Sequence, residues 1–156
     1  MKHFTKIRTL VVMLFVLLGT TIPASAVERP FALNGTGVAP LIFDGSGNLI
    51  GANPTGSGTA TYLGQWTVAG TVHYTPDANG VLRSTGDATV NASNGDKLQI
   101  QIAGTLDPVA GMDQGVFRFV GGTGRFEGAT GEANFVVKIN PITGGFDLTV
   151  VGKIDF

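Results

Sequence analysis

The feature that most constrains the fold of this chain is its regular alternation of short β-prone runs with turn residues. Beyond residue 26, runs rich in Val, Ile, Thr and Phe are interrupted by Gly, Asn, Asp or Pro at intervals of about ten residues. No stretch there has the 3.6-residue hydrophobic period of an amphipathic helix. With 43% hydrophobic and only 13% charged residues, the chain is neither a disordered polar segment nor a charged helical protein. The pattern predicts a domain built almost entirely of strands.

Eight strands are expected, joined mainly by hairpin turns, at residues 31–38, 58–63, 65–75, 81–92, 97–106, 115–120, 133–140 and 146–154. The segments 77–80 and 94–96 contain Asn, Asp and Gly, which tolerate the positive φ angles of tight turns. Successive hairpins favour an all-β, eight-stranded antiparallel up-and-down β-barrel, because closure leaves no strand edge unpaired. A sandwich of two sheets is the alternative.

Alternation within the strands indicates one apolar and one polar face. In the run 65–75, Trp66 and Tyr74 share one face with two valines, and His73 shares the other with two threonines. An eight-stranded barrel is just wide enough to be filled by side chains or to hold one small ligand. The 24 glycines favour a residual cavity, with Trp66 and Tyr74 as candidate ligand-binding residues. The alternation does not say which face lines the lumen.

The first 26 residues have the composition of a secretory signal peptide. A basic start is followed by the unbroken apolar run 10–18 and by Ala-Ser-Ala at 24–26, which fits a cleavage site. The apolar run is too short to span a bilayer, which takes roughly 20 residues. We therefore expect residues 1–26 to be removed. Residues 27–156 should form a single barrel domain, exported to the periplasm or the extracellular medium, with no stable membrane anchor.

The remaining chain is poor in groups that build catalytic or metal centres. It has no cysteine and a single histidine, His73, so thiolate zinc, multi-histidine zinc and 2-His-1-carboxylate iron sites cannot be assembled. A Gly-x-Ser-x-Gly nucleophile elbow is also missing. The formal charge of −1 argues against nucleic acid as a partner. We expect no metal and no cofactor. If the protein is an enzyme, it should be a cofactor-independent cyclase or isomerase.

One segment, residues 120–131, is especially rich in glycine and reads Val-Gly-Gly-Thr-Gly-Arg-Phe-Glu-Gly-Ala-Thr-Gly. A phosphate-binding loop would need Lys followed by Ser or Thr at the start of a helix, and this segment has no lysine. The glycines instead predict a tight corner between two strands, with Phe126 plugging one end of the barrel. The structural residues of this corner are Gly121, Gly122, Gly124, Phe126, Gly128 and Gly131.

This segment resembles the Gly-Gly-Ser/Thr-Gly-x-Phe-x-Gly-x-x-Gly segment of plant allene oxide cyclases, and its Gly-Gly-Thr-Gly start is similar to that of dirigent proteins. Together with residues 58–67 and the turn 94–96, it makes the chain similar, over residues 31–156, to an exported bacterial branch of the allene oxide cyclase-like barrel family. The resemblance implies an eight-stranded barrel of the calycin type. Because both plant families associate as trimers, it also implies a homo-oligomer, by analogy a trimer.

The first strand corresponds to a strand that carries catalytic positions in the plant cyclases. There, a Glu and an Asn two residues apart project into the cavity, and a Pro further on shapes the pocket. The resemblance places Ala32 at the Glu position and Asn34 at the Asn position, with Pro40 one residue out of register. It implies that Ala32 and Asn34 face the lumen and that Asn34 and Pro40 contact a ligand. Alanine cannot polarise an epoxide, so the plant cyclisation is not expected, and Ala32→Glu should place a carboxylate in the lumen.

Three functions are consistent with these observations. The first is a secreted barrel that binds a small hydrophobic or amphipathic molecule, the expected partner, in its lumen. The second is a cyclase or isomerase, similar to allene oxide cyclases or dirigent proteins, that controls the stereochemistry of a reactive intermediate. Such catalysis depends mainly on shape and a few polar groups. The third is a non-catalytic structural module of the cell envelope whose barrel is filled.

Overall fold

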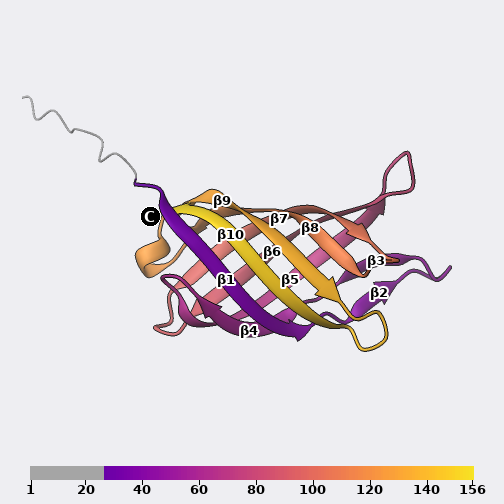
Figure 1. Ribbon diagram of the computed structural model, residues 1–156, viewed down its shortest axis with the longest axis horizontal. Helices are drawn as coiled ribbons and strands as arrows, with labels where there is room; N and C mark the ends of the chain where they lie inside the picture. The colour runs from indigo at the N-terminus through magenta and orange to yellow at the C-terminus, as the bar shows by residue number, and fades with distance from the viewer. Residues whose placement is uncertain (1–26) are drawn as a thin grey trace, which may run out of the picture.

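The computed structural model describes residues 27–156, which form ten strands and one short 3-10 helix (Figure 1). The strands are β1 (Arg29–Val38), β2 (Leu41–Phe43), β3 (Leu49–Ala52), β4 (Thr55–Ala60), β5 (Gly64–Pro76), β6 (Leu82–Ala92), β7 (Lys97–Asp107), β8 (Met112–Gly122), β9 (Thr130–Ile139) and β10 (Gly145–Asp155). The signal peptide predicted for residues 1–26 lies outside the described residues. Within residues 27–156, no helix is long and apolar enough to cross a membrane.

All ten strands belong to one antiparallel sheet that closes on itself. Strands β5 to β10 follow one another in the sheet, β10 pairs with β1, and β1 pairs with β4, which returns to β5. The short strands β2 and β3 continue β1 and β4 beyond their ends, and β3 pairs with the second half of β5. The ring therefore has eight strand positions. The predicted up-and-down barrel is confirmed, and the alternative of two packed sheets is wrong because the ring of strands is continuous.

Two of the eight strand positions are broken at prolines. Pro40 lies between β1 and β2, and Pro54 lies between β3 and β4; neither has an N–H group to continue the ladder. The backbone N–H of Asn53 donates to the Pro40 carbonyl at 3.1 Å, which keeps the two breaks together. Beyond them the β2–β3 hairpin extends at one end of the barrel (Figure 1). No strand was expected over 41–52, because strands of three or four residues are too short to show alternation.

The apolar faces of the strands point into the barrel. On β5, Trp66 and Tyr74 are buried whereas His73 is exposed. On β7, Leu98 and its apolar neighbours at alternate positions are buried, while Gln99 is exposed. The two faces predicted from alternation are therefore formed, and the structure assigns the apolar one to the interior.

Strand β1 corrects the expectation drawn from the plant cyclases. Phe31 and Leu33 are only 2% and 1% exposed and point into the barrel. Ala32 and Asn34, which alternate with them, point to the outer wall, where Asn34 is exposed. The expected lumenal direction of Ala32 and Asn34 is therefore wrong. The physical reason is the two-residue period of a strand: turning Ala32 and Asn34 inward would place two large apolar side chains in water.

One end of the barrel is covered by the connection between β8 and β9. This connection contains the 3-10 helix η1 (Gly124–Phe126), which lies near the C-terminus (Figure 1). Phe126 is fully buried there, with its ring centroid 5.1 Å from that of Phe156. Four of the five glycines assigned to this corner, all except Gly122, have positive φ angles. We call this end the closed end.

A salt bridge fastens η1 to the neighbouring turns of the closed end. The Arg125 Nε donates to Asp96 Oδ2 at 3.1 Å, and its Nη1 donates to the Tyr62 carbonyl at 3.0 Å. The connection between β8 and β9 is thereby joined to those between β4 and β5 and between β6 and β7. We call the opposite end, which carries the β2–β3 hairpin and the turns after β5, β7 and β9, the open end (Figure 1).

Candidate functional site

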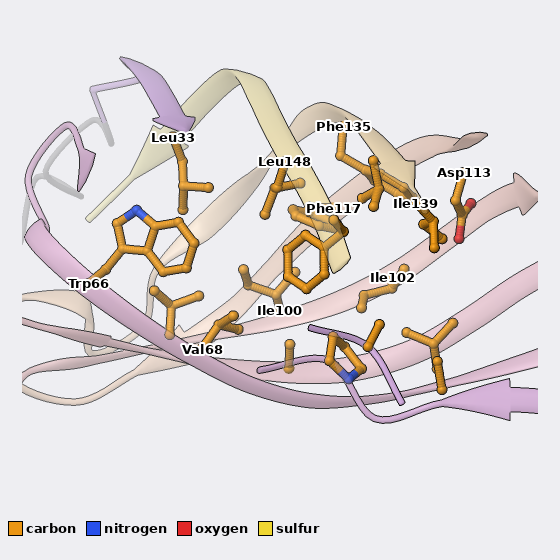
Figure 2. Close-up of a pocket in the computed structure, with 18 of the residues that line it drawn as sticks. Leu33, Trp66, Val68, Ile100, Ile102, Asp113, Phe117, Phe135, Ile139 and Leu148 are labelled. Atoms are coloured by element: carbon orange, nitrogen blue, oxygen red, sulfur yellow. The ribbon is translucent and has the colours of Figure 1, made fainter. Parts of the chain in front are cut away.

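A cavity of about 80 Å³ lies inside the barrel (Figure 2). Its walls are mostly apolar, with Leu33, Trp66, Ile100, Phe117, Phe135 and Leu148 among the lining residues. The lining extends from Trp66 on one side of the view to Asp113 on the other, and it includes no residue of η1. It also includes Ala39, Pro54 and Ile139, which lie where strands end toward the open end. The cavity therefore extends from Trp66, near the start of β5, to the strand ends at the open end.

The volume of the cavity limits what it can hold. Pockets for drug-sized ligands measure about 300–1,000 Å³, whereas one water needs only about 10–15 Å³ of cavity measured in this way. The inward-facing side chains of Val68, Ala88 and Val137 remain partly exposed, so the lumen is not completely filled. In this conformation the lumen accommodates a slender or small apolar group, and a larger guest requires the lining side chains to move.

Trp66 occupies the inner part of the cavity because glycine leaves space for it. Its ring lies against Gly35 of β1, and a Cβ atom at that position would collide with the indole. Trp66 is 2% exposed, and its indole N–H has no hydrogen-bond acceptor within residues 27–156. The inner wall of the cavity is thus the aromatic ring of Trp66, whose N–H group is itself buried.

A buried polar cluster lies at the other side of the cavity. The Ser84 hydroxyl on β6 donates to Asp113 Oδ1 on β8 at 2.7 Å, although β7 runs between these strands. Gly104 of β7 pairs with Ser84 and makes this contact possible, since a Cβ atom there would lie 2.8 Å from Ser84 Oγ. Tyr74 of β5 is the cross-strand partner of Ser84. Polar side chains from three strands therefore lie at this side of the apolar lumen, with Ser84 and Asp113 hydrogen-bonded to each other.

Burial changes the proton affinity of this cluster. Loss of hydration raises the pKa of Asp113, and the hydrogen bonds from Ser84 and from the backbone N–H of Gln114 oppose that rise only in part. Burial also raises the pKa of Tyr74, and the negative charge of Asp113 adds to the effect. The phenol therefore stays neutral, and the carboxyl group holds its proton more readily than an exposed aspartate. Such a pair can donate hydrogen bonds to a guest, and the carboxyl group can act as an acid.

The structure separates the four candidate ligand-binding residues into two groups. Trp66 and Tyr74 both line the cavity. Asn34 lies on the outer wall, and Pro40 is exposed at the break between β1 and β2, so neither is part of the lining. Pro54, at the adjacent break, lines the cavity instead.

Sequence reasoning did not place Ser84 or Asp113 in the lumen, although the alternation contained a signal for both. Ser84 lies six residues before the buried Val90 and shares its face of β6. Asp113 lies four residues before the buried Phe117 and shares its face of β8. If the two-residue alternation is followed toward the N-terminal end of each strand, it places one polar residue on the apolar face. The predicted strand 115–120 began too late to include Asp113.

The other side chain considered for catalysis, His73, lies outside the lumen. His73 is exposed on the outer wall of β5. Within the part of the chain that the structure describes, no three His, Asp or Glu side chains gather in a way that would hold a metal ion. The lumen with its polar cluster is therefore the strongest candidate site of residues 27–156.

The fold and the site define a closed, antiparallel, eight-stranded barrel with a small apolar lumen. No family model matches the sequence, and no curated protein sequence matches it. Among solved structures, the fold is similar to that of the pterocarpan synthase dirigent protein GePTS1, with a TM-score of 0.53. The two share 15% sequence identity, and the match covers 84% of this chain and 93% of that one. At this identity the likeness shows the fold alone, which is a dirigent-like barrel.

Proposed function

We propose that the barrel binds a small hydrophobic or amphipathic molecule in its lumen. The observation that carries this proposal is the partly open apolar cavity with a single polar cluster at one side. The apolar part of the guest would lie between Trp66 and Phe117, and its polar group would lie toward Tyr74 and Asp113. Apolar walls with a few polar groups that fix orientation are typical of small-molecule sites.

The polar cluster favours a neutral polar group over an anion. A hydroxyl group can donate to the Asp113 carboxylate or accept from its protonated form, and it can accept from the phenol of Tyr74. An anionic group would be placed beside the carboxylate of Asp113 in a medium of low dielectric, which is unfavourable. We therefore expect slender primary alcohols and small phenols to bind better than carboxylates of the same carbon skeleton.

Trp66 provides a direct test, because it is the only tryptophan in the sequence. Titration with linear alcohols of increasing chain length should change its emission saturably, and calorimetry should give the same dissociation constant. In Trp66→Phe the emission change should disappear while the circular dichroism spectrum stays that of a β protein. Absence of saturable binding by calorimetry across alcohols, phenols and hydrocarbons would overturn the proposal and favour a filled structural barrel.

A matched pair of substitutions tests the place of binding. Ala88 faces the lumen and lines the cavity, whereas Ala69 is exposed on the outer wall of the adjacent strand β5. Ala88→Leu should fill the cavity and abolish binding, and Ala69→Leu should leave binding unchanged. Equal binding by both variants would show that the guest lies elsewhere.

A second candidate function is that of a dirigent-like or allene oxide cyclase-like cyclase or isomerase. The buried Asp113 favours it, because a carboxyl group with a raised pKa can donate a proton to a reactive intermediate held in the lumen. Asp113→Asn keeps the shape of the side chain and cannot supply that proton. If the barrel is catalytic, this variant should still bind the reactant, such as an epoxide or a polyene, and should lose turnover.

Export and self-association belong to the same proposal. We expect the purified protein to begin at Val27, which intact-mass measurement of protein recovered from outside the cytoplasm would check. We also expect a homo-oligomer, by analogy a trimer. Light scattering that gave a strict monomer at micromolar concentration would contradict this expectation.

A further inference from the structure

The open end of the barrel carries exposed apolar side chains on all of its hairpin connections. We call this set the apolar rim: Ile42, Phe43 and Ile50 on the β2–β3 hairpin, Val81 between β5 and β6, Val109 between β7 and β8, and Ile142 between β9 and β10. Val109 and Ile142 are 97% and 92% exposed, and no other large apolar side chain described is as exposed. Water contact at this level is unfavourable for side chains of this kind.

Hydrogen bonds from side chains order the backbone of three of these turns. Asp107 Oδ1 accepts from the backbone N–H of Val109 at 2.9 Å, and Asn140 Oδ1 accepts from the backbone N–H of Ile142 at 2.9 Å. Asp77 Oδ1 likewise accepts from the N–H of Val81 at 3.0 Å. The apolar tips are thus presented on ordered turns, and their contact with a partner needs little further ordering of the backbone.

The turns of the apolar rim connect the ends of strands that line the lumen. Tyr74 lies two residues before the end of β5, and Asp113 is the second residue of β8, so both flank rim turns. Ile139 ends β9 and Phe146 is the second residue of β10, so both flank the turn that carries Ile142. A molecule that enters at the rim would therefore meet the polar side chains of Tyr74 and Asp113 together with the apolar side chains of Ile139 and Phe146.

We propose that the apolar rim docks on the surface of a neutral or zwitterionic lipid layer, with the open end of the barrel facing the acyl chains. The tips come from four separate connections with polar turn residues between them. A fluid layer can receive such tips one by one, whereas a folded partner protein needs a continuous complementary surface. Docking does not depend on the lumen being occupied, although it would give a lipid-soluble guest a dry route into the barrel.

The charge of the open end selects the kind of lipid. The segments 44–48, 77–81, 107–111 and 140–144 contain no Lys or Arg, and they contain Asp44, Asp77 and Asp107. The nearby Arg83 is paired with Asp77 at 3.2 Å. Attraction to anionic lipid requires clustered basic residues at the surface. The rim therefore fits uncharged or zwitterionic headgroups.

Co-sedimentation with vesicles tests this proposal on protein purified after expression of the full chain, with no lumenal guest added. Phosphatidylcholine vesicles should bind the protein, and replacing part of the lipid by phosphatidylglycerol should not increase binding. The double variant Val109→Ser/Ile142→Ser should lower the partition coefficient by about tenfold or more. The control variant Val120→Ser/Val151→Ser changes exposed side chains on the outer wall away from the rim and should bind as the original chain does.

Several outcomes would overturn the proposal. They are absence of binding to phosphatidylcholine, equal binding by the rim and control variants, and binding that requires anionic lipid. If the rim variant instead changes the mass measured by light scattering without changing sedimentation, the rim joins two copies of this chain. Because both variants keep residues 1–26, an unprocessed apolar N-terminus would affect them equally. Failure here would leave the Trp66 titration in lipid-free buffer unaffected, so the two proposals can fail separately.

Discussion

The two ends of the barrel differ in how far their apolar side chains are buried. At the closed end, Phe126 is fully buried, and Arg125 fastens its connection to the turns on either side. At the open end, Val109 and Ile142 are almost fully exposed at the tips of their turns. The comparison indicates that apolar burial stabilises the closed end more than the open end, which is where we propose that binding occurs. Each prediction below measures one part of this difference.

The largest expected effect comes from removing the aromatic ring at the closed end. Phe126→Ala should lower the free energy of unfolding by about 3–5 kcal/mol, because a fully buried ring is lost and a cavity remains. Phe43→Ala, at the open end, removes a ring that is 55% exposed and should change the free energy by no more than about 0.5 kcal/mol. Urea unfolding monitored by circular dichroism would measure both. Similar losses for the two variants would contradict the comparison.

Replacing a glycine with positive φ should also destabilise the protein more at the closed end than at the open end. Gly80 has a φ of 78° and open space where a side chain would lie, so Gly80→Ala should cost only about 1–2 kcal/mol for the left-handed backbone. Gly124 has a φ of 61°, and its added Cβ atom would also collide with the carboxylate of Asp96. Gly124→Ala should therefore lower the free energy of unfolding further than Gly80→Ala does. Equal losses would show that the contact with Asp96 relaxes without cost.

The two ends should also respond oppositely to pH. Burial raises the pKa of Asp113, so above the unfolded value of about 4 the native state binds more protons than the unfolded chain, and stability falls as pH rises. Asp96 has a lowered pKa, first because the Asn94 side chain donates to it, so its contribution is present above about pH 4 and is lost as pH falls.

Unfolding of Asp113→Asn and Asp96→Asn across a pH series would separate these contributions. The stability of the original chain relative to Asp113→Asn should decrease from about pH 4 toward neutrality. The stability of the original chain relative to Asp96→Asn should decrease as the pH falls below about 4. Slopes of the same sign would show that one of the two carboxyl groups has a different environment in solution.

Local sequence patterns were sufficient to predict the barrel. The alternation in 65–75 and 97–106 and the turn residues at 77–80 depend only on neighbours in the chain, and the structure places strands and turns there. The breaks at Pro40 and Pro54 were not predicted, because they depend on how β1 and β4 bend around the ring. The direction of Ala32 and Asn34 was wrong because it was taken from a resemblance and not from the larger side chains that alternate with them.

The candidate site was predictable only in part. Trp66 and Tyr74 stood out as aromatic residues on an apolar face, and both line the cavity. Ser84 and Asp113 are 29 residues apart, and their contact depends on the register of three strands and on the missing side chain of Gly104. Alternation can show that each faces inward, but it cannot show that they meet. The polar cluster is therefore a property of the register of the assembled barrel.

The smallest effect is expected for Ala32→Glu. This variant tests whether a change on the outer wall near the closed end affects the interior of the barrel. Ala32 lies on β1 near the closed end, but its side chain points to the outer wall beside Val151 of β10. A glutamate there should extend into water and change the free energy of unfolding by no more than about 0.5 kcal/mol. It should also leave the Trp66 emission unchanged, since no carboxylate enters the lumen.

The matched change Leu33→Glu, one residue further along, would bury a charge in the lining and should unfold the barrel or strongly destabilise it. A shift of Trp66 emission in Ala32→Glu would show that β1 presents the opposite face to the lumen in solution.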